Sequence, residues 1–197
     1  TIICTAEKET IAVDAIADAL KERLVDRGCV EVRGGDLAKL ERLIVTSDNH
    51  INRDFIGKDA KKILAAIGVR VSGDPRLVIA DVPEEHPFVQ HETLLPVHPI
   101  VRARNVDEAI AAAVRVEHGY GHTAVMYSQD IAALHRMARV INCSIFVKNA
   151  PNLAGLGYGG EGYTSFTIAS PTGEGLTTAV HFTRERRCTL KEYFRIV

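Results

Sequence analysis

The stretch PIVRARNVDEAIAAAVRVEHGYGHTAVMYSQDIAALHRMARVINCSIFVK, residues 99–148, decides the fold class. Its apolar spacing alternates between the strand and helix periods, which predicts strand, helix, strand, helix and strand over 99–104, 105–117, 122–127, 128–140 and 144–148. Asn105 and Glu108 have the spacing of a capping box, and Ser128 is placed to cap the second helix. This order predicts two β-α-β units in series, with a parallel sheet and right-handed crossovers.

The residues before this stretch continue the pattern. Alternating apolar residues predict a strand over 9–13, and Asp14 is expected to cap the helix that follows it. Asp36 is expected to cap a second, short helix. A third helix is expected over 59–67 and a buried strand over 76–82. Together the elements predict one α/β domain, a three-layer, open, mostly parallel sheet with helices on both faces.

The residues after position 148 change in character. Residues 149–162 are rich in glycine and predict a loop. Strands are expected over 163–169 and 177–183, on either side of a turn at 171–175. The tail from Arg184 onward is mixed, with a short strand expected over 188–190.

The composition of the 197 residues narrows the function classes. The chain is 46% hydrophobic and 25% charged with a net charge of −1, which favours neither nucleic acid nor an anionic membrane as partner. No apolar run approaches the roughly 20 residues of a membrane helix. The four cysteines have no zinc-site spacing, so we expect free thiols in a reducing compartment. The chain opens on Thr-Ile-Ile-Cys without Met, as expected of a portion of a longer protein.

Three patterns in the sequence are partial matches to nucleotide-, phosphate- or metal-binding motifs. Residues 155–160 match GxGxxG, but no helix pattern follows and no acidic residue lies about 20 positions on, so we expect a tight loop and not a nucleotide site. Residues 171–175 lack the Lys and the helix of a phosphate loop. His86, His91 and His98 are only loosely clustered, and we expect no metal site.

Cys4 is the candidate nucleophile. A lone Cys is more often a small buried apolar residue than a nucleophile. Cys4, however, stands between a short apolar stretch and the polar Thr-Ala-Glu-Lys-Glu, where a loop would expose its sulfur. Lys8 is a nearby cation of the kind that lowers a thiol pKa. A catalytic Cys would also need a His that is close in space.

Several segments together resemble the aldehyde dehydrogenase superfamily, and within it the CoA-acylating propionaldehyde and acetaldehyde dehydrogenases of bacterial microcompartments. The resemblance covers the chain from Cys4 to Val197. The segments that carry it are Ile-Cys4-Thr-Ala-Glu-Lys-Glu, His91-Glu-Thr-Leu-Leu-Pro-Val97, Glu117-His-Gly-Tyr-Gly-His-Thr-Ala124, Ile145-Phe-Val-Lys-Asn149, Ala154-Gly-Leu-Gly-Tyr-Gly-Gly-Glu-Gly-Tyr-Thr164, Pro171-Thr-Gly-Glu-Gly175 and Arg186-Arg-Cys188.

The resemblance implies roles for individual residues. Cys4 matches the family nucleophile, and Glu92 matches the carboxylate that holds the nicotinamide ribose of NAD. His122 matches a histidine near the reactive sulfur in the acylating group. Asn149 and the glycine loop match segments that line the active-site wall and subunit contacts, although Asn149 is equally expected to be purely structural. His122 has an alternative as well, that of a satisfied structural histidine.

The resemblance also implies what this chain lacks. Residues 1–197 would form the catalytic domain with a C-terminal oligomerisation-type segment, whereas the domain that binds NAD and coenzyme A, and the Asn of the oxyanion hole, would precede Cys4. The implied reaction converts a small aldehyde, CoA and NAD⁺ to acyl-CoA and NADH through a thioester on Cys4. The implied enzyme is a cytoplasmic homo-oligomer. The resemblance leaves open whether it lies inside a microcompartment and contacts the shell. The chain alone is expected to be inactive.

Three alternatives remain open at this point. A hydrolytic aldehyde dehydrogenase would differ by a Glu base that lies upstream of this chain. A non-catalytic assembly module would use the glycine loop and late strands for subunit pairing, and its Cys4 would be inert. An unrelated Cys–His hydrolase is the third, and the extent of the resemblance argues against it.

Overall fold

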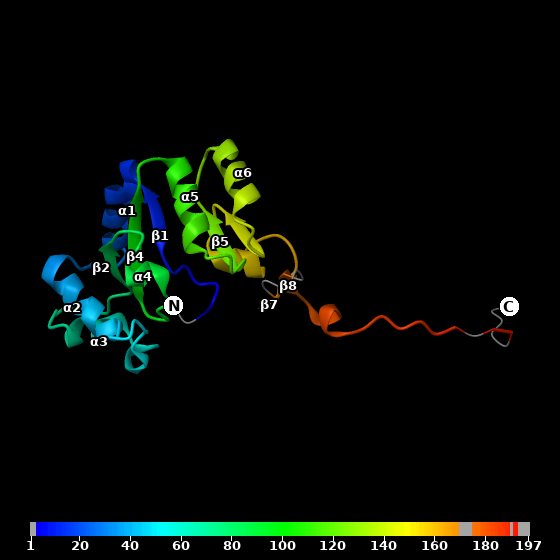
Figure 1. Cartoon of the computed structure of the whole chain (residues 1–197), viewed down its shortest axis with the longest axis horizontal. Helices are drawn as coiled ribbons and strands as arrows, with labels where there is room; N and C mark the ends of the chain where they lie inside the picture. The colour runs from blue at the N-terminus through cyan, green and yellow to red at the C-terminus, as the bar shows by residue number, and fades with distance from the viewer. Residues whose placement is uncertain (1–2, 170–174, 190, 193–197) are drawn as a thin grey trace.

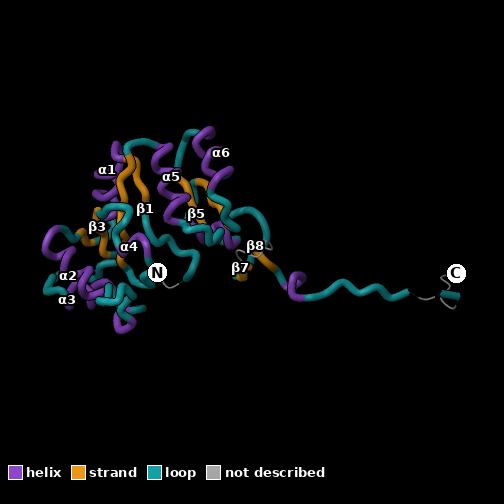
Figure 2. Tube along the Cα trace, in the orientation of Figure 1, coloured by secondary structure: helices purple, strands orange, loops and turns teal. Residues whose placement is uncertain are grey.

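The computed structural model describes residues 3–169, 175–189 and 191–192. Helices and strands pack together up to about residue 156, and the tail after strand β8 (Gly175–Thr177) extends away from them (Figure 1). Loops connect most of the short elements, as the tube in Figure 2 shows. No helix in the described part of the chain is both long and apolar enough to cross a membrane.

The larger sheet has four parallel strands in the order β1-β4-β3-β2. The strands are β1 (Thr10–Val13), β2 (Val30–Glu31), β3 (Val78–Asp81) and β4 (Val97–Ala103). Residues 78–80 of β3 are fully buried and β4 is buried at every position but Arg102. Continuous burial of this kind is typical of parallel strands that are covered on both faces.

Successive side chains of β3 face opposite layers, which makes this region three layers thick. Ile79 packs with Ala17 of α1 (Asp14–Asp26) in one apolar cluster. Val78 and Ala80 belong to the larger cluster on the other face. Helices α2 (Gly34–Ile44), α3 (Ala60–Ala66) and α4 (Pro87–Gln90) supply side chains to that cluster, with the 3-10 turn η1 (Arg53–Phe55) beside them.

The second sheet contains β5 (Thr123–Met126) and β6 (Ile145–Lys148), which are parallel and joined by α6 (Ile131–Val140). Helix α5 (Val106–Val116) packs against β1, β4 and α6, between the two sheets. The prediction of two β-α-β units in one sheet is therefore wrong for the first unit. Strand β4 already has β1 on one edge and β3 on the other, so β5 has no edge of β4 to pair with.

The helix starts test the predicted caps. The side chain of Asn105 accepts a hydrogen bond from the Glu108 N–H at 2.9 Å, which confirms the first one. The cap of α6 is Asp130, which accepts from Ala132 and Ala133, and not Ser128 as predicted. Ser128 instead accepts a hydrogen bond from the N–H of Asp130, so it supports the cap residue and does not contact the helix N–H groups itself.

Two further predicted caps are wrong, by one position for Asp14 and by three for Asp36, because the residues at the cap positions are Val13 and Arg33. Helix α1 begins at Asp14 itself and α2 begins at Gly34, two residues before Asp36. Neither aspartate caps its helix. Both lie in the first turn, where a negative charge is favoured by the helix dipole.

The glycine-rich loop contains the 3-10 turn η2 (Asn152–Leu156), which packs on β6. A Cβ at Gly155 would overlap Ile145 Cγ2 and lie 2.9 Å from Val147 Cγ2. Gly157 has φ +96° and its Cβ would lie 2.8 Å from Thr164 Cα. The expectation of a tight loop in which backbone passes closely by its neighbours is confirmed.

The last elements are shorter than predicted. Strands β7 (Thr167–Ala169) and β8 pair antiparallel, and the 3-10 turn η3 (Ala179–Phe182) follows. Residues 188 and 189 are not in a strand. Position 190, and residues 171–174 of the predicted turn, lie outside the described residues.

A buried ion cluster lies at the carboxyl end of the larger sheet. Lys21 of α1, only 6% exposed, contacts Asp81 at 2.6 Å and Glu31 at 3.0 Å. Burial by itself raises the pKa of Asp81, but hydrogen bonds from Lys21 and Arg102 outweigh it and the pKa is lowered. Arg102 also contacts Asp14 at 2.8 Å, so the cluster joins α1 to β2, β3 and β4.

We predict that Lys21→Met lowers the free energy of unfolding by about 2–3 kcal/mol, because Asp81 and Glu31 lose the buried cation that compensates them. Chemical denaturation measures this. Lys39→Met is the matched control, since Lys39 is exposed and pairs only with Asp36 in the described contacts, and it should cost about 0.5 kcal/mol or less. Equal losses in the two variants would contradict the assigned role of Lys21.

We also predict that Gly155→Ala destabilises the protein by about 1–3 kcal/mol, because the added methyl group overlaps the side chains of β6. Gly35→Ala is the control. Gly35 lies in α2, has nothing within 4 Å of its Cβ position, and should gain up to about 1 kcal/mol. A thermal melt of both variants checks the pair; an unchanged melting temperature for Gly155→Ala would mean that η2 does not pack on β6.

Candidate functional site

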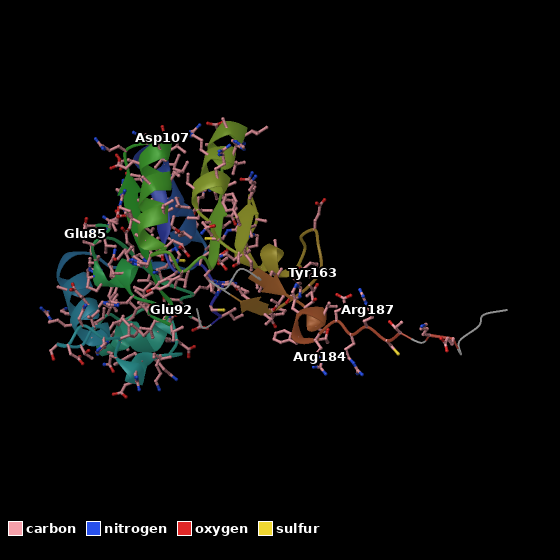
Figure 3. The ribbon with its side chains drawn as sticks, turned by 45° about the vertical axis from the view of Figure 1, so that its right-hand side comes forward. Glu85, Glu92, Asp107, Tyr163, Arg184 and Arg187 are labelled. Atoms are coloured by element: carbon pink, nitrogen blue, oxygen red, sulfur yellow. The ribbon has the colours of Figure 1, made fainter. Side chains whose placement is uncertain are left out.

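The topology brings the three candidate residues to one end of the larger sheet. Cys4 precedes β1 and Glu92 precedes β4, so both lie at the amino ends of these parallel strands. Helix α5 runs back from the carboxyl end of β4, as Figure 1 shows, and it therefore returns the chain to this end before His122. In Figure 3, Glu92 lies at this end and Asp107, in the first turn of α5, at the opposite end.

Cys4 lies in a short turn that exposes its side chain. The turn is closed by the Ala6 N–H, which donates to the Ile3 carbonyl at 2.9 Å. Thr5, the next residue, is only 2% exposed. A buried residue directly after an exposed thiol fixes the backbone beneath it while leaving the sulfur accessible. The expectation that a loop exposes Cys4 is confirmed.

Three side chains anchor the segment that links Cys4 to β1. The Glu7 carboxylate accepts from the backbone N–H of Asn152 at 2.9 Å. Lys8 Nζ donates to the Val89 carbonyl of α4 at 2.8 Å. Thr10 Oγ1 lies 2.7 Å from Nε2 of His98 in β4. The segment is therefore attached to α4 and β4 and, through η2, to the second sheet.

The charges around these anchors are largely compensated. Lys8 Nζ lies 3.4 Å from Glu9, so its charge is shared with that carboxylate and with Val89 O. Burial raises the pKa of Glu9, and the charge of Lys8 opposes this only in part. Burial lowers the pKa of His98, against the opposing effects of the Glu7 charge and backbone, and keeps its imidazole neutral near pH 7. Lys8 thus acts as an anchor to α4, a role not foreseen from the sequence.

Glu92 and His122 differ in their surroundings. Glu92 is exposed in the loop after α4. His122 is half-buried; its backbone N–H donates to Glu117 at 2.9 Å and its Nδ1 lies 2.7 Å from Thr123 Oγ1. Among the described contacts, no hydrogen bond or ion pair joins Cys4, Glu92 and His122. The structure brings the three to the same end of the sheet and leaves their side chains separate.

The other three cysteines lack this setting. Cys29 is buried against α1, and burial raises its pKa. Burial, with a contribution from the charge of Glu117, raises the pKa of Cys143 to about 12. Cys188 is exposed in the tail. All four thiols are free, as the sequence predicts.

A surface pocket lies at the other end of the larger sheet. It has a volume of about 470 Å³ and is lined at the carboxyl ends of β3 and β4 by Asp81, Arg102 and Glu108, among others. This is the usual ligand position in α/β folds. Here, however, these three side chains are tied up in ion pairs, and Cys4 is at the other end of the sheet. Across the described residues, no group of three or more His, Cys, Asp or Glu is arranged to hold a metal ion.

The structure adds residues to the site that the sequence did not single out. Glu7 and Asn152 are 145 positions apart, and nothing in their local patterns links them. The sequence presents His98 only as one of three loosely clustered histidines, with His86 and His91. His86 instead caps α4 by accepting a hydrogen bond from the Phe88 N–H, whereas His98 contacts Thr10.

Asn149 has a structural role, one of the two roles expected from the sequence, because its side chain links two loops by hydrogen bonds. It has φ +55°, and its side chain accepts from Ser128 N–H at 2.8 Å and donates to Ser128 O at 2.9 Å. These two bonds tie the carboxyl end of β6 to that of β5.

Comparison with known proteins places this arrangement in a family. The model of the aldehyde dehydrogenase family matches residues 74–179. The acetylating acetaldehyde dehydrogenase EutE of Salmonella typhimurium is 45% identical over 201 residues, which cover 100% of this chain and 43% of that protein.

Solved structures agree. The propionaldehyde dehydrogenase of Rhodopseudomonas palustris, with bound propionyl-CoA, superposes with a TM-score of 0.90 at 47% identity, over 95% of this chain and 42% of that one. It has also been solved with bound CoA and an acylated cysteine.

A propionaldehyde dehydrogenase from the fucose utilisation microcompartment of Clostridium phytofermentans has a TM-score of 0.89 at 42% identity, over 98% of this chain and 45% of that one. Variants of it with a histidine or a cysteine replaced by alanine have also been solved. The chain spans less than half the length of these relatives. Because the family model matches more than half of its residues and the fold is shared, this chain belongs to the aldehyde dehydrogenase family.

Proposed function

We propose that these residues form the nucleophile-bearing part of a CoA-acylating aldehyde dehydrogenase, which converts a small aldehyde such as propionaldehyde or acetaldehyde, with CoA and NAD⁺, to acyl-CoA and NADH. The observation that carries the proposal is the exposed Cys4 thiol on an anchored turn, at the same end of the sheet as Glu92 and His122. The rest of the cofactor site is proposed to lie in a preceding domain.

Two features of the relatives support the assignment of residues. The Rhodopseudomonas enzyme carries its acyl group on a cysteine. In the Clostridium enzyme, the cysteine and the histidine that were replaced are separated in sequence by the same interval as Cys4 and His122. This interval supports roles in one reaction for both residues.

The chain's own residues account for the bond changes at the aldehyde carbon. The Cys4 thiolate attacks this carbon, and the oxyanion of the resulting thiohemiacetal accepts a hydrogen bond from the Cys4 N–H. Loss of hydride leaves a thioester on Cys4. NAD, when bound, accepts the hydride, and CoA, when bound, supplies the thiol that takes the acyl group.

Glu92 and His122 have supporting roles in this proposal. The exposed carboxylate of Glu92 fits a pair of ribose hydroxyls, which are hydrogen-bond donors, and so would orient the nicotinamide half of NAD. His122 is half-buried, and its imidazole can accept and release a proton, which suits it to take the proton of the incoming thiol.

We further propose that the protein acts in the cytoplasm as a homo-oligomer and, as in the Clostridium relative, inside a microcompartment. Val180 and Phe182 in the tail are 75% and 72% exposed. Arg184 and Arg187 project from the same extended segment (Figure 3). An extended segment with exposed apolar and basic side chains supports subunit pairing through the tail.

In the enzyme that carries these residues with its cofactor-binding domain, Cys4→Ala should lower CoA-dependent NADH formation by at least about 10³-fold, because no thioester can form. Cys188→Ala, which removes the other exposed thiol, should retain wild-type activity. The assay is NADH absorbance with propionaldehyde and acetaldehyde, with and without CoA. If the wild type forms NADH and free acid equally well without CoA, the hydrolytic alternative replaces the proposal.

His122→Ala should slow transfer of the acyl group to CoA by about 10²-fold while leaving acylation of Cys4 within about 3-fold, because the imidazole acts on the incoming thiol. Single-turnover kinetics separate the two steps: the NADH burst reports acylation and acyl-CoA formation reports transfer. His135→Ala, on the exposed face of α6, is the control. A normal transfer rate in His122→Ala would leave His122 with a structural role only.

A further inference from the structure

The residues between Cys4 and β1 hold their place without regular secondary structure. Residues 7–9 are in neither helix nor strand, and apart from the bond between Ala6 and Ile3 the described backbone bonds do not fix the turn. Together with the buried Thr5, the side-chain anchors at Glu7, Lys8 and Thr10 therefore set the position of the thiol.

Glu7 differs from the other two anchors in what it joins. Lys8 is attached to α4 and Thr10 to β4, which both belong to the layers of the larger sheet. Glu7 is attached to Asn152, at the start of η2, which packs on β6 of the second sheet. It is also the anchor nearest to Cys4 in sequence.

The acceptor that Glu7 provides is one that η2 otherwise lacks. The first N–H groups of a helical turn have no partner within the turn. Pro151 precedes η2 and makes no side-chain cap. Asn152 is only 6% exposed, so its N–H would be costly to leave without an acceptor. The Glu7 carboxylate satisfies it at 2.9 Å.

Other groups show that Glu7 lies where the two sheets meet. Its charge and backbone act on buried His98 of β4. Its charge also acts, together with burial, on the ring of Tyr127 just after β5. The Glu7 carboxylate thus bonds to η2 and lies near enough to β4 and to the end of β5 for its charge to act on them.

We propose that Glu7 is a positioning residue for the Cys4 thiol, and that its hydrogen bond to Asn152 N–H sets the nucleophile's place relative to the glycine-rich loop. The proposal rests on the proposed role of Cys4. Lengthening or loss of this one bond frees the turn from the second sheet while Lys8 and Thr10 keep it on the first. Small displacements of a reacting group cost large factors in rate.

The test compares Glu7→Gln, Glu7→Ala and the control Glu22→Ala, which lies on the exposed face of α1. The amide oxygen of Gln still accepts the bond, so Glu7→Gln should stay within about 3-fold of wild type. Glu7→Ala should lower the rate of Cys4 alkylation by iodoacetamide, and kcat in the full-length enzyme, by about 10-fold or more, with KM for the aldehyde changed less than about 2-fold. Alkylation of Cys188 in the same sample is the internal reference.

A second variant removes the donor instead of the acceptor. Asn152→Pro lacks the backbone N–H, and at the start of η2 a proline suits the turn. It should slow Cys4 alkylation as Glu7→Ala does, and the double variant should be no slower than either one. Wild-type Cys4 alkylation in folded Glu7→Ala, additive losses in the double variant, or a Glu7→Gln as slow as Glu7→Ala would each overturn the proposal.

The alkylation readout also separates this proposal from the proposed function. If the wild type shows no CoA-dependent NADH formation, the proposed function fails. The rates of Cys4 alkylation in the same variants then still decide whether Glu7 positions the thiol.

Discussion

The parallel pairing of β1 with β4 is the constraint on which the rest of the structure depends. Thr10 lies opposite Ile100 and Val13 opposite Ala103, so the two strands run in the same direction over the whole of β1. This pairing places the residues before β1 at the amino end of the sheet. It also fills the last open edge of β4, which leaves β5 and β6 to form a second sheet on the far side of α5.

Two consequences for the site follow from that arrangement. The segment that carries Cys4 enters β1 where the two sheets meet, so it needs contacts to both of them. Glu7 contacts the second sheet through η2, and Lys8 and Thr10 contact α4 and β4 of the larger sheet's layers. The opposite, carboxyl end of the sheet is used for stability. There Lys21 and Arg102 hold together carboxylates from α1, β2 and β3. The proposed catalytic residues and the stabilising ion cluster thus lie at opposite ends of one sheet.

The sequence predicts the local features well, because they depend on neighbouring residues. Asn105 and Glu108 mark the start of α5, and the glycines at 155 and 157 mark a close approach of backbone. The family resemblance makes Cys4 the candidate nucleophile, whereas its local pattern alone would leave it an ordinary lone thiol.

What the sequence does not predict depends on long-range pairing. The competition between β1 and β5 for the edge of β4 has no local signal, so the series of β-α-β units gives the wrong sheet. The bond between Glu7 and Asn152 joins residues far apart in the chain, and the buried setting of His98 follows from the whole layer arrangement. Either Asp130 or Ser128 could cap α6 by its residue type. Which of them does so depends on the path of the backbone after β5, and neither residue determines that path alone.

The most direct test of the central claim is mass spectrometry of the Cys4 peptide after the full-length enzyme reacts with propionaldehyde and NAD⁺ without CoA. We predict a propionyl mass on Cys4, and its loss, with formation of propionyl-CoA, when CoA is added. A Cys4 peptide of unchanged mass during turnover, or an acyl group on a different residue, would contradict it.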